Sequence, residues 1–223
     1  GATLYIPEGV VRMLSENCLE DYALGLSEPQ KKSNALSFRI LLNENCVIED
    51  INVFKTKVYV KRLTYEQADQ QRHSTDLAPL FDIAERNIQR RKNANAVFIE
   101  FPEVEIFIDN DKNVSIKPKT FYQSSIVVRE AMLLAGEAAA KFAFKNNLPF
   151  PYISQEAPDL PKDLPSGLAG NYKLRRSMRS RSVGITPSSH AGLGLGMYSQ
   201  VTSPLRRYGD LVAHQQLRAF IDN

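Results

Sequence analysis

Two adjacent arginines near the end of the sequence are the residues whose setting points most directly to chemistry. They close the run Thr-Ser-Pro-Leu-Arg-Arg at residues 202–207. Hydroxyl side chains cap helix N-termini and proline suits the first helical position, so Thr202 or Ser203 should cap a helix that begins at Pro204. The buried face of that helix should hold four apolar residues at three-and-four spacing, namely Leu205, Tyr208, Leu211 and Val212.

The predicted helix places Arg206 and Arg207 in its first turn, where backbone N–H groups already attract negative charge. Cations are normally disfavoured at this end of a helix. The pattern therefore indicates that an anion, such as a phosphate or a carboxylate, binds between the guanidinium groups and the backbone amides. The alternative is a pair of ordinary ion pairs beside a capped helix, and the residues alone do not favour one interpretation over the other.

This stretch resembles the closing signature of the ribonuclease II / ribonuclease R (RNB) exoribonuclease family. In that family an aromatic residue, a Thr-Ser-Pro-Ile/Leu-Arg-Arg/Lys-Tyr run and an Asp-Leu-x-x-His helix follow one another, as they do here between Tyr198 and His214. Residues 190–195 resemble the His-Phe-Gly-Leu element that precedes the signature. Gln200 and Gln215 depart from the pattern, because many members have His and Arg at these positions.

Four further residues match the family pattern one by one and in the right order along the chain. The resemblance implies that Tyr5 and Phe98 clamp the terminal bases of an RNA, and that Tyr65 and Glu130 recognise its ribose. Aromatic faces accept any base, and a contact to the 2′-hydroxyl separates RNA from DNA. Taken singly, the aromatic residues would more often be core, and a helical glutamate would more often be a surface acid or an ion-pair partner.

The resemblance implies a processive, hydrolytic 3′→5′ exoribonuclease that acts on single-stranded RNA and releases nucleoside 5′-monophosphates. Arg206 would stabilise charge on the reacting phosphate, and Arg207 would add an RNA contact. Family members hold Mg²⁺ with aspartates spaced Asp-x-x-x-x-x-Asp-x-Asp-Asp, a pattern that this sequence lacks. We therefore expect the aspartate-bearing segment to precede Gly1 in the parent enzyme, and this chain alone not to cleave RNA. The alternative is a non-catalytic RNA-binding or scaffold module with a degenerate or absent metal site.

The composition is compatible with this reading and restricts the alternatives. A net charge of +3 and a pI near 8.8 permit a polyanionic partner without requiring one. Cys18 and Cys46 form neither a zinc pattern nor a disulfide framework, so we expect two buried, reduced thiols. No apolar run reaches the length of a membrane helix and no signal peptide is evident, which predicts a cytoplasmic protein. Nothing indicates a protein partner.

The pattern of apolar residues predicts an α+β fold, in which helices pack on a mixed, largely antiparallel sheet. We treat residues 1–223 as one RNB-like domain. Strands are expected at 1–6, 35–42 and 46–62, with a hairpin of 96–108 and 114–119 across 109–112. Helices are expected at 64–71, 76–92 and 124–147, and a loop with a short helix at 9–24. The inward residues of the two long helices should be Leu77, Leu80, Phe81, Ile83, Ala84, Ile88, Val127, Ala131, Leu134, Ala135, Ala138 and Phe142.

Residues 151–182 are dense in Pro, Gly, Asp and Ser, and we expect a long internal loop there. This segment includes the whole basic run 173–181, which has five cations in nine residues. The run would either line an RNA entry path by neutralising phosphates or remain a solvated loop. The glycine-rich residues 192–196 have the wrong spacing for a phosphate-binding loop, so we expect an extended, tightly packed segment.

Overall fold

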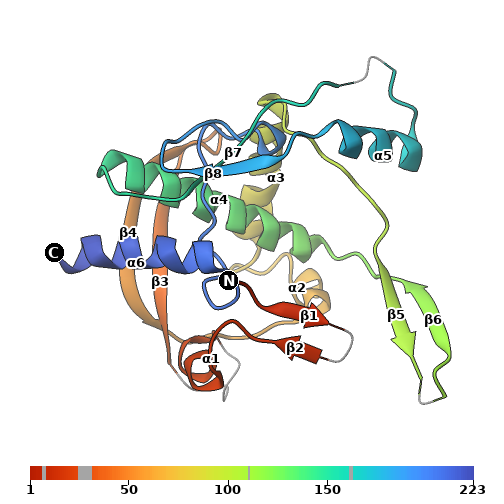
Figure 1. Ribbon diagram of the computed structural model, residues 1–223, viewed down its shortest axis with the longest axis horizontal. Coiled ribbons are helices and arrows are strands. Elements are labelled where there is room, and N and C mark those ends of the chain that lie inside the picture. Colours follow the sequence, from red (N-terminus) through yellow and green to blue (C-terminus); the bar gives the residue numbers. More distant parts are fainter. Residues whose placement is uncertain (7–8, 25–31, 110, 161–162) are drawn as a thin grey trace.

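The computed structural model describes residues 1–6, 9–24, 32–109, 111–160 and 163–223 (Figure 1). The predicted turn at 109–112 and loop at 151–182 therefore each contain residues outside the described ranges. The helices and strands, in chain order, are β1 (Leu4–Ile6), β2 (Gly9–Val11), α1 (Glu16–Tyr22), β3 (Ser33–Leu42), β4 (Ile48–Val58), α2 (Tyr65–Gln70), α3 (Ala78–Asn93), β5 (Val104–Ile108), β6 (Val114–Pro118), α4 (Gln123–Lys145), β7 (Tyr152–Gln155), α5 (Gly167–Ser177), β8 (Arg181–Gly184) and α6 (Tyr208–Asp222).

The predicted α+β class is confirmed, and the strands pair antiparallel. Within the described residues they form four separate pairs, β1–β2, β3–β4, β5–β6 and β7–β8, rather than one continuous sheet. The longest pair, β3–β4, contacts both α4 and α6 (Figure 1). The turn between these strands is held by the Asn43 side chain, which accepts hydrogen bonds from the N–H groups of Asn45 and Val47, each at 3.0 Å.

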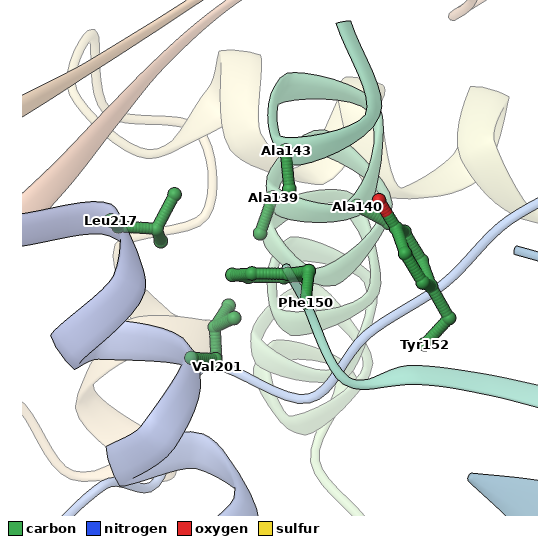
Figure 2. Close-up of a cluster of buried hydrophobic side chains, with 8 residues drawn as sticks. Ala139, Ala140, Ala143, Phe150, Tyr152, Val201 and Leu217 are labelled. Atoms are coloured by element: carbon green, nitrogen blue, oxygen red, sulfur yellow. The ribbon is translucent and has the colours of Figure 1, made fainter. Parts of the chain in front are cut away.

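Helix α4 is the central element of the core. Its alanines present a smooth surface on which larger side chains can lie close to the helix backbone. Figure 2 shows Phe150 against this surface, with Val201 and Leu217 beside it. The fully buried cluster consists of Ala139, Ala140, Ala143, Phe150, Tyr152, Val201, Ala213 and Leu217. The core therefore joins α4 to α6 and to the segment that carries the signature.

The interface between α3 and α4 is polar, which the sequence did not predict. Glu130 and Glu137 are buried on α4. Their carboxylates are bonded to three side chains of α3, namely Asn87, Arg90 and Arg91. Buried carboxylates require such donors because an unpaired buried charge is very costly. Two predictions of an inward, apolar position are therefore wrong: Leu80 of α3 and Ala131 of α4 are both exposed, because the inward arc of each helix carries the charged groups instead.

Three further predictions need correction. Residues 151–182 are not one long loop, since they contain β7, α5 and the start of β8. The glycine-rich run is closely packed at Gly192 and Gly194 but not at Gly196, around which a Cβ atom would meet open space. It is also not extended: residues 191–193 form a 3₁₀ turn that ends at Gly194 with φ of +66°. Cys46 is buried, but Cys18 is exposed because α1 buries none of its residues. Across the described ranges, every helix is too short or too polar to span a membrane.

Candidate functional site

The two signature arginines lie in a turn that precedes helix α6. The N–H groups of Arg206 and Arg207 both donate to the carbonyl of Ser203, at 3.2 and 3.0 Å. Helix α6 begins only at Tyr208, and Arg207 is its N-cap residue. The predictions that the helix starts at Pro204, that Thr202 or Ser203 caps it and that the arginines occupy its first turn are therefore wrong. Tyr208 is also exposed rather than buried.

The carboxylate of Asp210 explains where the helix begins. Its Oδ2 accepts a hydrogen bond from the backbone N–H of Ser203 at 2.9 Å and one from Nη2 of Arg207 at 2.7 Å. Asp210 is only 1% exposed, so these donors offset the cost of removing its charge from water. The chain before α6 therefore folds back onto the first turn of the helix instead of extending the helix axis.

Arg206 and Arg207 differ in their availability to a ligand. The guanidinium of Arg207 is bonded to Asp210 and lies 3.4 Å from Oγ1 of Thr202. The side chain of Arg206 is exposed, and no acid or carbonyl in the described part of the chain pairs with it. Arg206 is thus the signature arginine that can bind an external anion, whereas the charge of Arg207 is largely compensated within the protein.

Phe98 and Glu130 are joined through Arg91. Nε and Nη2 of Arg91 donate to the Glu130 carboxylate at 3.1 and 3.0 Å. The same guanidinium lies 5.0 Å from the centroid of the Phe98 ring, and Nζ of Lys92 lies 5.6 Å from it. Burial lowers the pKa of Arg91 from its ordinary value, while the charge of Glu130 opposes this shift. The half-buried Phe98 ring is thereby held against two cations.

Glu130 itself lies beneath the surface. It is 0% exposed, and its carboxylate accepts hydrogen bonds from Arg91, Asn87 and Arg129. Direct contact with a ribose hydroxyl is not available in this arrangement. Recognition of ribose by Glu130, which the family resemblance implies, stays a prediction; the geometry favours an indirect route, in which Glu130 holds Arg91 against Phe98.

Tyr5 and Tyr65 are exposed at two other places. Tyr5 pairs with Val10 in the β1–β2 hairpin and is 69% exposed. Tyr65 opens α2 and stacks on Tyr122, with ring centroids 6.4 Å apart and planes inclined by 22°. Neither ring is a core residue, so both have open surface for a base. Among the described contacts, none joins either ring directly to Phe98 or Arg206.

Tyr198 is a site residue that the sequence analysis did not single out. Its ring packs edge-on against His190 with centroids 5.8 Å apart. Burial raises the pKa of the Tyr198 hydroxyl, whereas the nearby charges of Arg207 and Arg91 lower it. The charges of Arg207, Asp210 and Arg91 therefore all act on the Tyr198 hydroxyl. The position of Tyr198 as the aromatic residue at the start of the signature could have identified it from the sequence.

The described residues do not fit a magnesium site. No group of three or more His, Cys, Asp or Glu side chains in those ranges is arranged to hold a metal ion. The buried acids Glu130, Glu137 and Asp210 are instead bound to arginines. The chemistry that these residues offer is therefore the binding of an anion by Arg206 and the stacking of rings on exposed aromatic side chains.

Comparison with known proteins identifies the family of the chain. The RNB domain profile matches residues 1–163 and 167–223, so the chain belongs to the RNB domain family. An uncharacterized ribonuclease of Synechocystis sp. is 36% identical over 230 residues, covering 98% of this chain and 34% of that protein. The chain thus spans about a third of the length of the curated relatives that it matches.

Solved structures share the fold. Mycoplasma genitalium RNase R in complex with ribose-methylated single-stranded RNA superposes with a TM-score of 0.80 at 19% identity, over 97% of this chain and 41% of that one. Yeast Ssd1, described as a pseudonuclease, superposes with a TM-score of 0.71 at 18% identity, over 99% of this chain and 33% of that one. The α+β fold is therefore the RNB fold, and it occurs in a nuclease and in a pseudonuclease.

Proposed function

We propose that this chain is the part of an RNB exoribonuclease that binds the 3′ end of single-stranded RNA. The parent enzyme would degrade RNA processively from 3′ to 5′ and release nucleoside 5′-monophosphates. The observation that carries the proposal is Arg206, an exposed guanidinium without a partner in the described residues, on a turn bonded to α6. Support comes from the RNA complex of the structurally similar RNase R.

Each site residue has a defined part in this proposal. Arg206 stabilises negative charge on the phosphate, which is worth most where water is partly excluded. Tyr5 and Phe98 stack on terminal bases, which contributes roughly 1–3 kcal/mol per base. Tyr65 contacts the ribose, and Glu130 acts on ribose recognition through Arg91. Arg207 contributes mainly by its bond to Asp210.

The parent enzyme would require Mg²⁺ and would be located in the cytoplasm. The Mg²⁺ ligands are not among the described residues, so no step of the reaction is assigned to a metal here. The chain's own contribution is to orient the RNA end and to neutralise phosphate charge.

A second candidate function is an RNA-binding module without catalysis. The observation in its favour is the lack of a metal-binding group in the described residues, together with the fold shared with a pseudonuclease. In this case Arg206 and the aromatic residues would bind RNA without cleaving it.

One assay tests the proposed function and separates the candidates. The purified chain is incubated with a 5′-labelled single-stranded oligoribonucleotide, either with Mg²⁺ or with a chelator. Bound but uncut RNA, with binding weakened by Arg206→Ala and not by the surface control Arg86→Ala, supports RNA-end binding by this chain. Adding the aspartate-bearing segment in trans and recovering cleavage supports the exonuclease, whereas continued inactivity supports the binding module. Absence of RNA binding contradicts both.

A further inference from the structure

The turn that carries Arg206 is held by two side chains of helix α6. Oδ2 of Asp210 accepts hydrogen bonds from the Ser203 N–H and from Arg207, as described above. His214 follows one helical turn later, and its Nε2 lies 2.6 Å from the carbonyl oxygen of Val201. A carbonyl can only accept, so Nε2 must carry the proton. The two side chains therefore bind the turn on both sides of Thr202.

The first residues of the chain hold the same turn from its other end. The N–H of Thr3 donates to the carbonyl of Arg206 at 3.1 Å, and the N–H of Tyr208 donates to the carbonyl of Gly1 at 3.0 Å. Ala2 also forms an antiparallel bridge with Arg207. Residues 201–207, here called the arginine turn, are thus fixed from α6 and from residues 1–3, which precede β1. The guanidinium of Arg206 has no internal partner in the described residues.

This arrangement matters for an arginine that acts on phosphate. A guanidinium stabilises developing charge only if it is already in place, because reorganising it would consume the energy that it supplies. The arginine turn has few internal hydrogen bonds, and fixing each backbone residue in one conformation costs conformational entropy. External bonds to Asp210 and His214 supply this ordering without occupying the Arg206 side chain.

We propose that Asp210 and His214 are positioning residues that hold the arginine turn so that Arg206 faces the RNA. The inference rests on the proposed function of Arg206. Asp210 keeps the neighbouring Arg207 bound to the protein, so only one of the two guanidinium groups is offered to phosphate. His214 fixes the N-terminal side of the turn through Val201, which is itself buried in the core.

The structure provides matched variants for each residue. Oδ1 of Asp210 is buried without a partner in the described residues, so Asp210→Asn can place its amide nitrogen there and keep the acceptor for Ser203. Asp210→Ala removes both. His214→Gln keeps a donor near Val201, whereas His214→Leu removes it. Asp222→Asn is the control, because it removes the same charge from an exposed position on the same helix, where Asp222 pairs with Lys55.

The first measurement is amide hydrogen exchange across residues 199–208, with exchange in α4 as the reference for global unfolding. In Asp210→Ala and His214→Leu, any loss of global stability accelerates the α4 amides and the turn amides alike. Beyond that shared change, the amides of Ser203, Arg206 and Arg207 should exchange about tenfold faster or more. Asp210→Asn and His214→Gln should recover part of the protection, and Asp222→Asn should leave it unchanged. Unchanged exchange in the turn of both Asp210→Ala and His214→Leu overturns the proposal.

The second measurement is binding of a single-stranded oligouridylate labelled at its 5′ end, followed by fluorescence anisotropy. Asp210→Ala should weaken binding about tenfold in the wild-type background and less than about twofold in Arg206→Ala, because the two changes act on one interaction. Equal losses in both backgrounds would mean that Asp210 does not act through Arg206. If wild-type protein does not bind the probe, the RNA-binding function fails, while the exchange measurement still decides whether Asp210 and His214 hold the turn. If Asp210→Ala does not fold, Asp210→Asn and His214→Leu decide both measurements.

Discussion

Arg206 and Arg207 are adjacent in the chain, yet their side chains have different electrostatic surroundings. Arg207 is paired with the buried Asp210, and removing one partner of a buried pair leaves an uncompensated charge. Arg206 is exposed and is bonded only through its backbone in the described residues. Substitution of Arg206 should therefore weaken RNA binding with little effect on stability, whereas substitution of Arg207 should mainly lower stability.

We expect Arg206→Ala to leave the free energy of unfolding within about 0.5 kcal/mol of wild type, since its side chain is at the surface. Binding of single-stranded RNA should weaken, and the slope of log K against log salt concentration should fall by about 0.7, the loss of one phosphate contact. Salt titrations of RNA binding measure this slope. An unchanged slope, together with a large stability loss, would assign Arg206 a structural role.

For Arg207→Ala we expect a loss of about 3 kcal/mol or more in the free energy of unfolding, because Asp210 then lies buried without its ion-pair partner. Urea denaturation of this variant beside Arg206→Ala provides the comparison. Equal stability of the two variants would show that the Arg207–Asp210 pair contributes nothing to folding.

The backbone of helix α4 packs directly against the backbone of the signature segment. The N–H of Ser199 donates to the carbonyl of Gly136 at 3.2 Å, and a Cβ atom at Gly136 would collide with the Tyr198 ring and with the Ser199 carbonyl. Glycine at this position is therefore a packing requirement, even though it weakens a helix. The Tyr198 ring can occupy its place only because α4 lacks a side chain at this position.

We expect Gly136→Ala to cost about 1–3 kcal/mol of stability, because backbone or ring must move to admit the methyl group. The matched control is Gly209→Ala in α6, where nothing lies within 4 Å of the added Cβ. That control should be neutral or stabilising by up to about 1 kcal/mol, through better helix propensity. Chemical denaturation of both variants tests the difference, and a neutral Gly136→Ala would contradict the close packing.

The α3–α4 interface should make the stability of the fold depend on acid. Burial alone would raise the pKa of Glu137, but hydrogen bonds and charge from Arg90 and Lys141 hold it below its ordinary value of 4.5. A carboxyl with a lowered folded pKa stabilises the protein above its unfolded pKa, and this contribution is lost as pH falls through the folded pKa. We expect the free energy of unfolding to decrease below about pH 4.5, and to decrease less steeply in Glu137→Gln. Denaturation at a series of pH values measures both slopes. Equal slopes would show that Glu137 does not contribute to the loss of stability in acid.

The whole molecule combines a tightly packed centre with a hairpin that extends from it. Figure 1 shows β5–β6 projecting away from α4. One face of this hairpin is apolar. It carries the cross-strand partners Val104, Ile106, Ile108, Val114, Ile116 and Pro118, whereas the other face carries Glu105, Phe107, Ser115 and Lys117. Its aliphatic side chains are exposed, so they contribute little to folding here.

We expect Ile106→Thr to change the free energy of unfolding by less than about 0.5 kcal/mol, since Ile106 is 63% exposed and threonine keeps the β-branched shape. Leu134→Ala in α4, where the side chain is buried, should cost about 2–5 kcal/mol by comparison. Thermal and urea denaturation compare the two variants. A large loss for Ile106→Thr would mean that the hairpin packs against the body of the protein.

Local patterns were sufficient to predict most of the elements. The periodicity of α3 and α4, the alternation of β3 and β4 and the turn residues between them depend on neighbours only a few positions away. Residues 151–182 were mispredicted because prolines concentrated between two short strands masked helix α5. The start of α6 was mispredicted because hydrogen bonds to Asp210 and Gly1 outweighed the usual preference for a helix after a capping hydroxyl and proline.

The signature, the family and the candidate residues were all readable from the order and type of amino acids, since each depends on residue identity and spacing. Which residues are available to a ligand depended on tertiary contacts. In the described residues the Arg206 guanidinium has no partner, whereas that of Arg207 is bonded to Asp210. Glu130 can be buried because α3 supplies Arg91 and Asn87, about forty positions away in the sequence, as hydrogen-bond donors. Burial and ion pairing depend on residues that are far apart in the sequence and come into contact only in the folded protein. Local sequence patterns therefore do not predict them.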